Sequence, residues 1–161
     1  MQRWVHEQGW TTLHDAQKRA IGPILDEHHD VIISAATAAG KTEAAFLPIC
    51  SALAHQRDVA RGAATADPWE GHDPWAPPVP PPAPGIEVLY LSPLKALIND
   101  QYDRLDMICD RADVAVHRWH GDVAGSEKRK TVKHPSGVLL ITPESLEAQF
   151  VNRGNEIATM F

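Results

Sequence analysis

Residues 35–42 read Ala-Ala-Thr-Ala-Ala-Gly-Lys-Thr, and this stretch constrains the fold of the chain more than any other. The apolar run 31–33 precedes it, and the mostly apolar segment 43–47 follows it. This order predicts a buried strand, a tight loop and a helix, which is the context that a phosphate-binding P-loop requires. Backbone N–H groups of such a loop and of the helix N-terminus surround a phosphate chain.

Two side chains of the predicted loop carry its chemistry. Lys41 is expected to place a charge beside the β- and γ-phosphates, and Thr42 to help hold Mg²⁺ through its hydroxyl group. Ala35 stands where the usual pattern has Gly, so the loop must take a conformation that Ala accepts. The competing interpretation is a plain strand-to-helix turn with an exposed Lys. The flanking strand and helix favour the P-loop.

Strand and helix patterns alternate along the rest of the chain. That alternation predicts an α/β fold with a parallel sheet and helices on both faces. Ligands of such sheets bind at the carboxyl ends of the strands. Strands are predicted at 31–35, 87–91, 114–116 and 138–141, and helices at 13–25 (kinked or divided at Gly22-Pro23), 41–56, 94–109, 124–133 and 143–151.

Residues 57–85 differ in composition from the rest. Eight of the thirteen prolines lie between Pro68 and Pro84. Proline removes backbone donors and fixes φ, so we expect an extended, mobile surface insertion. Trp69 and Trp75 lie within it; an exposed linker is favoured over a peptide-like docking element.

Length, charge and cysteine content limit the class of protein. A chain of 161 residues forms one domain or part of one. Its net charge of −6 is not typical of a protein that coats a duplex, but it allows a local groove for a single strand. Cys50 and Cys109 are predicted to be reduced core thiols, which suits the cytoplasm. Since no signal peptide or long apolar run is seen, neither secretion nor membrane insertion is expected.

Four further segments carry polar groups at predicted strand ends or helix starts. Gln17 precedes the P-loop strand, and its amide could read the edge of adenine; a helix-surface Gln is the alternative. The other segments suit backbone phosphates of a nucleic acid, although for any one of them taken alone an ordinary helix N-terminus is the favoured interpretation. They are Ser92–Leu97, His120–Asp122 and Thr142–Leu146.

In combination, these motifs resemble the first RecA-like domain of superfamily 2 DExH/DEAD-box helicases. Gln17 matches the family's Q-motif region, 35–42 motif I, 92–97 motif Ia and 142–146 motif Ib. The stretches 40–48 and 92–97 look most like the large helicase-related (Lhr-like) branch. The resemblance covers nearly the whole chain apart from the Pro-rich insertion.

The resemblance implies roles for particular residues, with ATP and Mg²⁺ as cofactors. Gln17 would read adenine, Lys41 and Thr42 would be catalytic, and Thr42 would contact Mg²⁺. The partner would be single-stranded or duplex nucleic acid, DNA being favoured, and a second RecA-like domain would supply arginines to the γ-phosphate. The implied ATP-binding loop residues are Thr37, Ala38, Ala39, Gly40, Lys41, Thr42 and Glu43, and the implied nucleic-acid contacts are Ser92, Pro93, Lys95, Gly121, Thr142 and Pro143.

In the family, motif Ib is followed by an apolar strand ending in Asp-Glu-x-His, and no such element follows residues 142–146 here. Asp100, Asp103 and Asp106 fall on a predicted helix and do not replace it. We therefore expect residues 1–161 to form a RecA-like domain that is incomplete at its C-terminal end and has an open sheet edge. Nucleotide binding would be weak at most, hydrolysis and unwinding negligible, and solubility poor.

Two other classes of function remain open. A small P-loop phosphotransferase would need clustered arginines, and the sequence shows none. A non-catalytic module that binds nucleic acid or a partner chain would use the basic residues 128–133, although a solvated basic helix is the favoured interpretation of that segment.

Overall fold

The computed structural model describes residues 12–26, 28–36, 39–65 and 85–161. Three strands form one parallel sheet in the order β1-β3-β2, so the predicted α/β class with a parallel sheet is confirmed. The elements are α2 (Asp15–Asp26), α3 (Lys41–Thr65), β1 (Ile86–Leu91), α4 (Lys95–Asp110), β2 (Val116–Trp119), α5 (Gly125–Lys133), β3 (Gly137–Ile141) and α6 (Pro143–Ala158).

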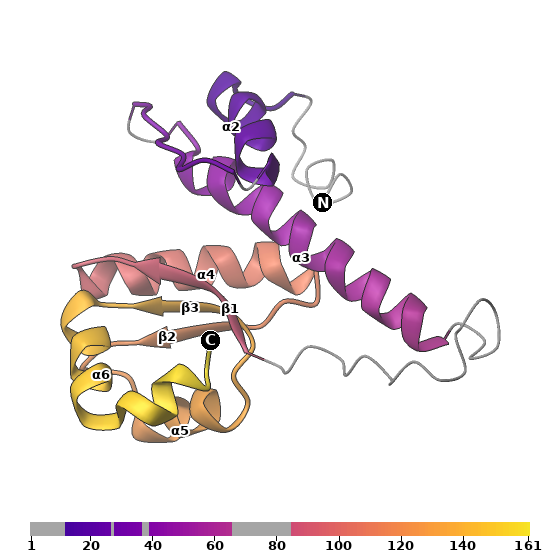
Figure 1. Cartoon of the computed structure of the whole chain (residues 1–161). Helices are drawn as coiled ribbons and strands as arrows, with labels where there is room; N and C mark the ends of the chain where they lie inside the picture. The colour runs from indigo at the N-terminus through magenta and orange to yellow at the C-terminus, as the bar shows by residue number, and fades with distance from the viewer. Residues whose placement is uncertain (1–11, 27, 37–38, 66–84) are drawn as a thin grey trace.

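Helices cover both faces of the sheet, as predicted. Successive side chains of a strand point to opposite faces, and β3 divides its residues accordingly. Val138 and Leu140 join the core formed with α3 and α4, whereas Leu139 and Ile141 pack into a second core that includes Ile157 at the end of α6. Figure 1 shows α4 along one face of the sheet and α5 and α6 along the other.

The two cysteines lie in the first of these cores. Cys50 of α3 and Cys109 of α4 are free and fully buried, with their sulfur atoms 3.1 Å apart. Burial without a disulfide agrees with the expectation of reduced core thiols. The pair also marks the contact between α3 and α4.

The predicted strand at 31–35 is not formed. Residues 31–36 have no regular secondary structure, and Ile32 is 93% exposed. A strand persists only when a neighbour pairs with its backbone groups. Within the described residues the sheet contains only β1, β3 and β2, and none of them pairs with this segment.

The helix that opens at the P-loop is longer than predicted. It continues to Thr65, so residues 57–65 are helical and do not belong to an extended insertion. This stretch contains several alanines and no proline, and the first proline of the insertion is Pro68. The rest of the predicted insertion, 66–84, lies outside the described residues together with Trp69 and Trp75.

Three other boundaries also differ from prediction. Pro23 lies inside a continuous α2 and does not divide it. Strand β2 covers Val116–Trp119 and not the predicted 114–116, and Asp113 in the preceding turn has a positive φ of 53°. Helix α6 extends beyond Val151 to Ala158 through a kink at Arg153. No helix in the described part of the chain is long and apolar enough to cross a membrane.

Candidate functional site

The carboxyl ends of the three strands bring the predicted nucleic-acid contacts to one edge of the sheet. The backbone N–H of Ser92, after β1, donates to the carbonyl of Ile141 over 3.2 Å, and that of Thr142, after β3, donates to Trp119 over 3.3 Å. The hydrogen-bond ladder thus extends one residue beyond the strands. In Figure 1 the three arrowheads lie on the side where α4 and α6 begin.

Lys95, in the first turn of α4, reaches the loop that follows β2. Its ammonium nitrogen lies 3.0 and 3.1 Å from the two carboxylate oxygens of Asp122. A Cβ added to Gly121 would lie 3.2 Å from the same nitrogen, so Lys95 crosses directly over this glycine. The hydrogen bond and the charge of Lys95 lower the pKa of Asp122. Asp122 is therefore an internal partner for the predicted phosphate contact, and a phosphate at Lys95 would compete with it.

The two predicted hydroxyl groups point inward at helix starts. Thr142 is buried; its hydroxyl donates to Ser145 Oγ over 2.9 Å and accepts the Ser145 backbone N–H over 3.3 Å. Ser92 Oγ is also buried and lies 3.5 Å from the backbone nitrogen of Leu94. Thr142 has the geometry of a helix cap, whereas Ser92 makes a local turn contact with Leu94, the N-cap residue of α4. Among the predicted contacts, the outward-facing groups are Pro93, Lys95, Gly121 and Pro143.

A hydrogen-bond network that could not be predicted from the sequence joins α4 to the end of β2 at this edge of the sheet. Asn99 of α4 accepts from His120 Nε2 over 3.1 Å and from the Arg118 guanidinium over 3.2 Å. The backbone N–H of Asp122 points to His120 Nδ1 at 3.4 Å, an arrangement that suits a neutral imidazole with its proton on Nε2. Burial lowers the pKa of His120. The segment His120–Asp122 was predicted to form part of this edge, but no sequence pattern predicted the role of Asn99.

The predicted P-loop has a backbone conformation at Gly40 that favours glycine. Gly40 has a φ of +71°, and a Cβ there would collide with the side-chain amide nitrogen of Gln17. Lys41 turns back over the loop and donates to the carbonyl oxygens of Ala35 and Ala36 at 2.8 and 2.7 Å. Thr37 and Ala38, two of the predicted ATP-binding residues, lie outside the described residues.

The next two P-loop residues are held by α4. The hydroxyl of Thr42 donates to Gln101 Oε1 over 2.9 Å. Glu43 is buried, and one carboxylate oxygen pairs with Arg104. Its other oxygen has no hydrogen-bond partner among the described residues.

Gln17 lies against the loop, as its predicted role requires, and is only 1% exposed. Its Oε1 accepts the backbone N–H of His14 over 2.9 Å, as a glutamine near a helix start often does. Its Nε2 is buried and has no hydrogen-bond partner in the described part of the chain. An unpaired buried donor is costly, so this nitrogen is a group that a ligand would satisfy.

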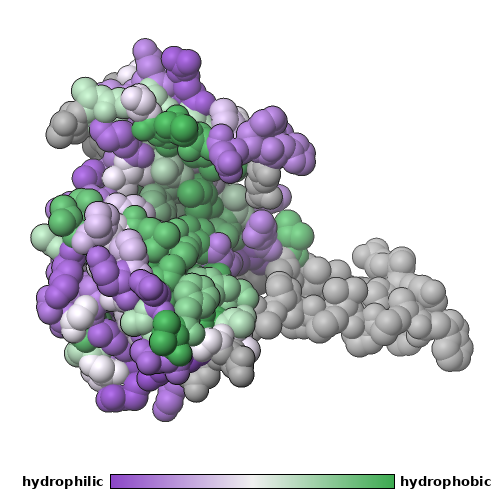
Figure 2. Space-filling view, turned by 60° about the vertical axis from the view of Figure 1, so that its left-hand side comes forward, coloured by the Kyte–Doolittle hydropathy of each residue, from purple (hydrophilic) through white to green (hydrophobic). Residues whose placement is uncertain are grey.

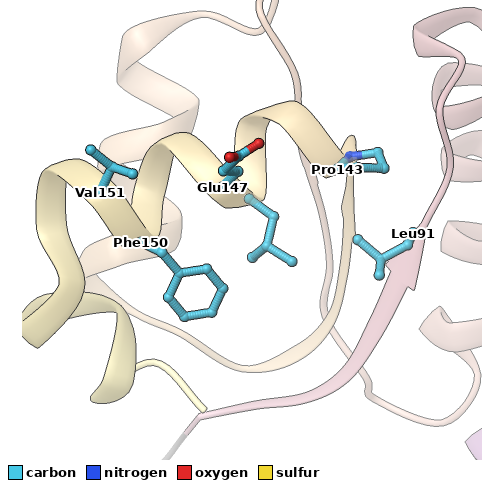
Figure 3. A pocket seen from close by; sticks show the side chains of 6 residues that line it. Leu91, Pro143, Glu147, Phe150 and Val151 are labelled. Carbon is cyan, nitrogen blue, oxygen red and sulfur yellow. The ribbon is translucent and has the colours of Figure 1, made fainter.

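A concavity lies at the end of β1. It has a volume of about 420 Å³ and is mainly apolar. Leu91 comes from β1, and the other lining residues come from α6 (Figure 3). They are Pro143, Leu146, Glu147, Phe150 and Val151.

The family profile described as DEAD/DEAH box helicase matches residues 14–160. The chain belongs to this family. The DEAD/DEAH box helicases similar to it include the ATP-dependent helicase Lhr-Core of Saccharolobus solfataricus, 30% identical over 151 residues that cover 89% of this chain and 15% of the relative. The Lhr-Core of Methanothermobacter thermautotrophicus is 30% identical over 161 residues, which cover 92% of this chain and 16% of the relative. The chain thus spans about a sixth of these relatives.

Solved structures of helicases agree with the fold. The Mycobacterium smegmatis helicase Lhr, solved with ssDNA and AMP-PNP, aligns with a TM-score of 0.67 at 26% identity, covering 98% of this chain and 18% of that one. A hypothetical ATP-dependent RNA helicase from Sulfolobus tokodaii aligns with a TM-score of 0.64 at 17% identity, covering 93% and 35%. The resemblance to Lhr-like helicases and the RecA-like fold predicted from the sequence are confirmed.

Proposed function

We propose that residues 1–161 form an ATP-binding RecA-like domain of an ATP-dependent nucleic-acid helicase that acts in the cytoplasm. The contact between Gln17 and Gly40 carries this proposal. It joins the residue predicted to read adenine to the loop predicted to hold phosphates, and it leaves the Gln17 amide donor buried without a partner. Adenine N7 is an acceptor suited to that donor.

The side chains of the loop fit MgATP, which would supply the phosphoanhydride bond that the family's reaction cleaves. The Lys41 ammonium has three donors, and two of them are used by the carbonyls of Ala35 and Ala36. The remaining donor is available to phosphate oxygens. Thr42 donates its only proton to Gln101, which leaves the lone pairs of its hydroxyl oxygen for Mg²⁺.

Hydrolysis requires groups that these residues do not supply. The only Asp-Glu-x-His sequence in the chain, residues 26–29, lies before the P-loop and not after motif Ib, where the family pattern has it. Asp100 lies on α4, and its carboxylate accepts a hydrogen bond from the side chain of Gln101 on the same helix. It does not replace the acidic residues of the family motif. Because phosphoryl transfer depends on positioned charge, we expect the chain to bind ATP with negligible turnover.

Calorimetric titration of the chain with ATP and Mg²⁺ tests this function. We expect saturable binding that weakens at least about tenfold in Lys41→Ala, because a charged hydrogen bond is lost. Lys18→Ala, which removes an exposed lysine of α2, is the matched control. ATP turnover by the chain that disappears in Lys41→Ala would contradict binding without hydrolysis, and absence of any nucleotide binding would overturn the proposal.

We also propose that single-stranded nucleic acid, with DNA favoured, crosses the strand-end edge at Lys95, Gly121 and Pro143. The exposed ammonium of Lys95 beside an exposed glycine supports this path, as does the similarity to an Lhr helicase solved with ssDNA. Lys95→Ala should weaken binding to a fluorescent DNA strand and lower the salt slope by about one. Lys18→Ala should leave both unchanged; equal effects of the two variants would contradict the path.

A non-catalytic binding module is the second candidate. Its support is the run of exposed cations Arg129, Lys130 and Lys133 on α5. Binding of single strands that needs no ATP and is lost when these three residues are changed to Ala, but not in Lys95→Ala, would favour this function.

A further inference from the structure

Helix α4 holds the first turn of α3 through two polar contacts. Gln101 accepts the Thr42 hydroxyl over 2.9 Å, and Arg104 pairs with Glu43. Gln101 is 5% exposed, so this hydrogen bond is shielded from water. These contacts join segments that lie about 60 positions apart in the sequence, and the first of them is made by Thr42, the residue predicted to contact Mg²⁺.

The orientation of the Gln101 amide is fixed from its other end. Its Nε2 donates to Asp100 Oδ2 over 3.0 Å. Since the carboxylate only accepts, the amide must present its oxygen to Thr42 and not its nitrogen. Thr42 is therefore the donor in this contact, and its hydroxyl oxygen keeps its lone pairs.

The hydrogen bond to Gln101 restricts the χ1 rotamer of Thr42. A threonine in a helix divides between two χ1 rotamers, because its hydroxyl can also donate to a carbonyl of the preceding turn. An acceptor on α4 selects one rotamer and draws the proton away from the loop. Helix α4 is itself anchored in the sheet core by buried Ile98 and Leu105, so the acceptor is held on a rigid element.

We propose that Gln101 is a positioning residue: it holds the Thr42 hydroxyl with its oxygen lone pairs directed to the Mg²⁺ of bound nucleotide. This inference rests on the proposed function, because it requires that the P-loop bind MgATP. It assigns Gln101 a role in metal affinity and none in contact with the nucleotide. A structural role in α3–α4 packing would instead affect nucleotide binding equally with and without metal.

The test compares ATP affinity in Mg²⁺ and in EDTA, by calorimetry on the full chain. The dissociation constant in EDTA divided by that in Mg²⁺ measures how much the metal contributes to ATP binding. In Gln101→Met, which keeps the side-chain length but loses the acceptor, this ratio should fall about three- to tenfold, the range that one hydrogen bond covers. The affinity in EDTA should not change. Gln149→Met makes the same change on α6 and should leave both values unchanged.

A double-mutant cycle with Thr42→Val separates positioning from other effects. In the Thr42→Val background, Gln101→Met should cause no further loss of the metal contribution. Circular dichroism melts show whether each variant folds. Should Gln101→Met not fold, Gln101→Asn, which withdraws the acceptor by one carbon but stays polar, is measured in the same way.

The outcomes are distinct. A metal contribution that survives in Gln101→Met, or equal losses in Mg²⁺ and EDTA, overturns the role of Gln101 and leaves ATP binding by the P-loop intact. If the unmodified chain binds no nucleotide in either condition, the proposed function fails and this inference fails with it. A loss confined to the Mg²⁺ titration and absent in the Thr42→Val background establishes the positioning role.

Discussion

At the scale of single residues, two side chains of α4 bind residues that lie far away in the sequence: Gln101 is hydrogen-bonded to Thr42, and Asn99 to His120. Gly40, Lys41 and Thr42 could be predicted as phosphate-binding residues because a P-loop is a contiguous pattern whose chemistry follows from its spacing. Gln101 and Asn99 were not found, because each acts on a residue far away in the chain, and one sequence does not show which side chains a fold brings together.

His117 and His120 make stability depend on pH. Burial is the main cause that lowers the pKa of each from its ordinary value of about 6.5. The unfolded chain therefore binds more protons than the folded chain below that pH, and the free energy of unfolding falls as the pH falls. We expect the thermal midpoint to be steady near neutrality and to decline once the pH drops below about 6.5.

Replacing both imidazoles tests the assignment. In the variant His117→Gln with His120→Gln, the decline between neutral and mildly acidic pH should be shallower than in the unmodified chain. Melts followed by circular dichroism across this range supply the measurement. The same slope in both proteins would show that other groups govern the acid sensitivity.

At the scale of elements, the predicted helices and strands form where a segment has a clear apolar pattern and another element packs against it or pairs with it. Strands β1 and β3 are apolar runs that pair with each other, and helix α4 has a clear apolar face. The run 31–35 has the same local signal as β1, yet it forms no strand, because no described strand offers its backbone a hydrogen-bonding partner. Strand formation is a property of pairs, and a single segment does not determine it.

The start of β3 depends on a glycine that the sequence pattern did not distinguish. Gly137 has a φ of +69°, and a Cβ there would collide with the backbone carbonyl of Ala115, just before β2. The backbone nitrogen of Val138 donates to that same carbonyl over 2.9 Å, so the collision falls where the two strands first pair. Gly137→Ala should lower the free energy of unfolding by at least about 1–2 kcal/mol.

Urea denaturation measures this cost, and Gly22→Ala is the matched control. Gly22 lies inside α2 with nothing within 4 Å of an added Cβ, so the same substitution should be neutral or stabilise by up to about 1 kcal/mol. Equal effects at the two positions would mean that the contact with Ala115 does not constrain β3.

At the scale of the whole molecule, apolar surface lies open beside the strand-end edge. Among the described strands β1 is at an edge of the sheet, and its Leu89 and Leu91 are exposed. The concavity at the end of β1 continues this surface onto Phe150 and Val151 of α6, which are 56% and 78% exposed. Figure 2 shows a broad hydrophobic area on one face of the molecule. Such surfaces drive association between chains.

We therefore expect the isolated chain to self-associate with rising concentration, in keeping with the poor solubility expected from its sequence. A charge placed within the concavity would oppose this association, because it would have to be buried against apolar groups. Sedimentation velocity of Phe150→Lys should show a shift toward monomer. Val59→Lys adds the same charge at an exposed apolar position of α3, outside the concavity, and should leave association unchanged. A chain that stays monomeric at all concentrations and melts in one sharp transition would show that this apolar face is tolerated in water, and the expected solubility defect would then be wrong.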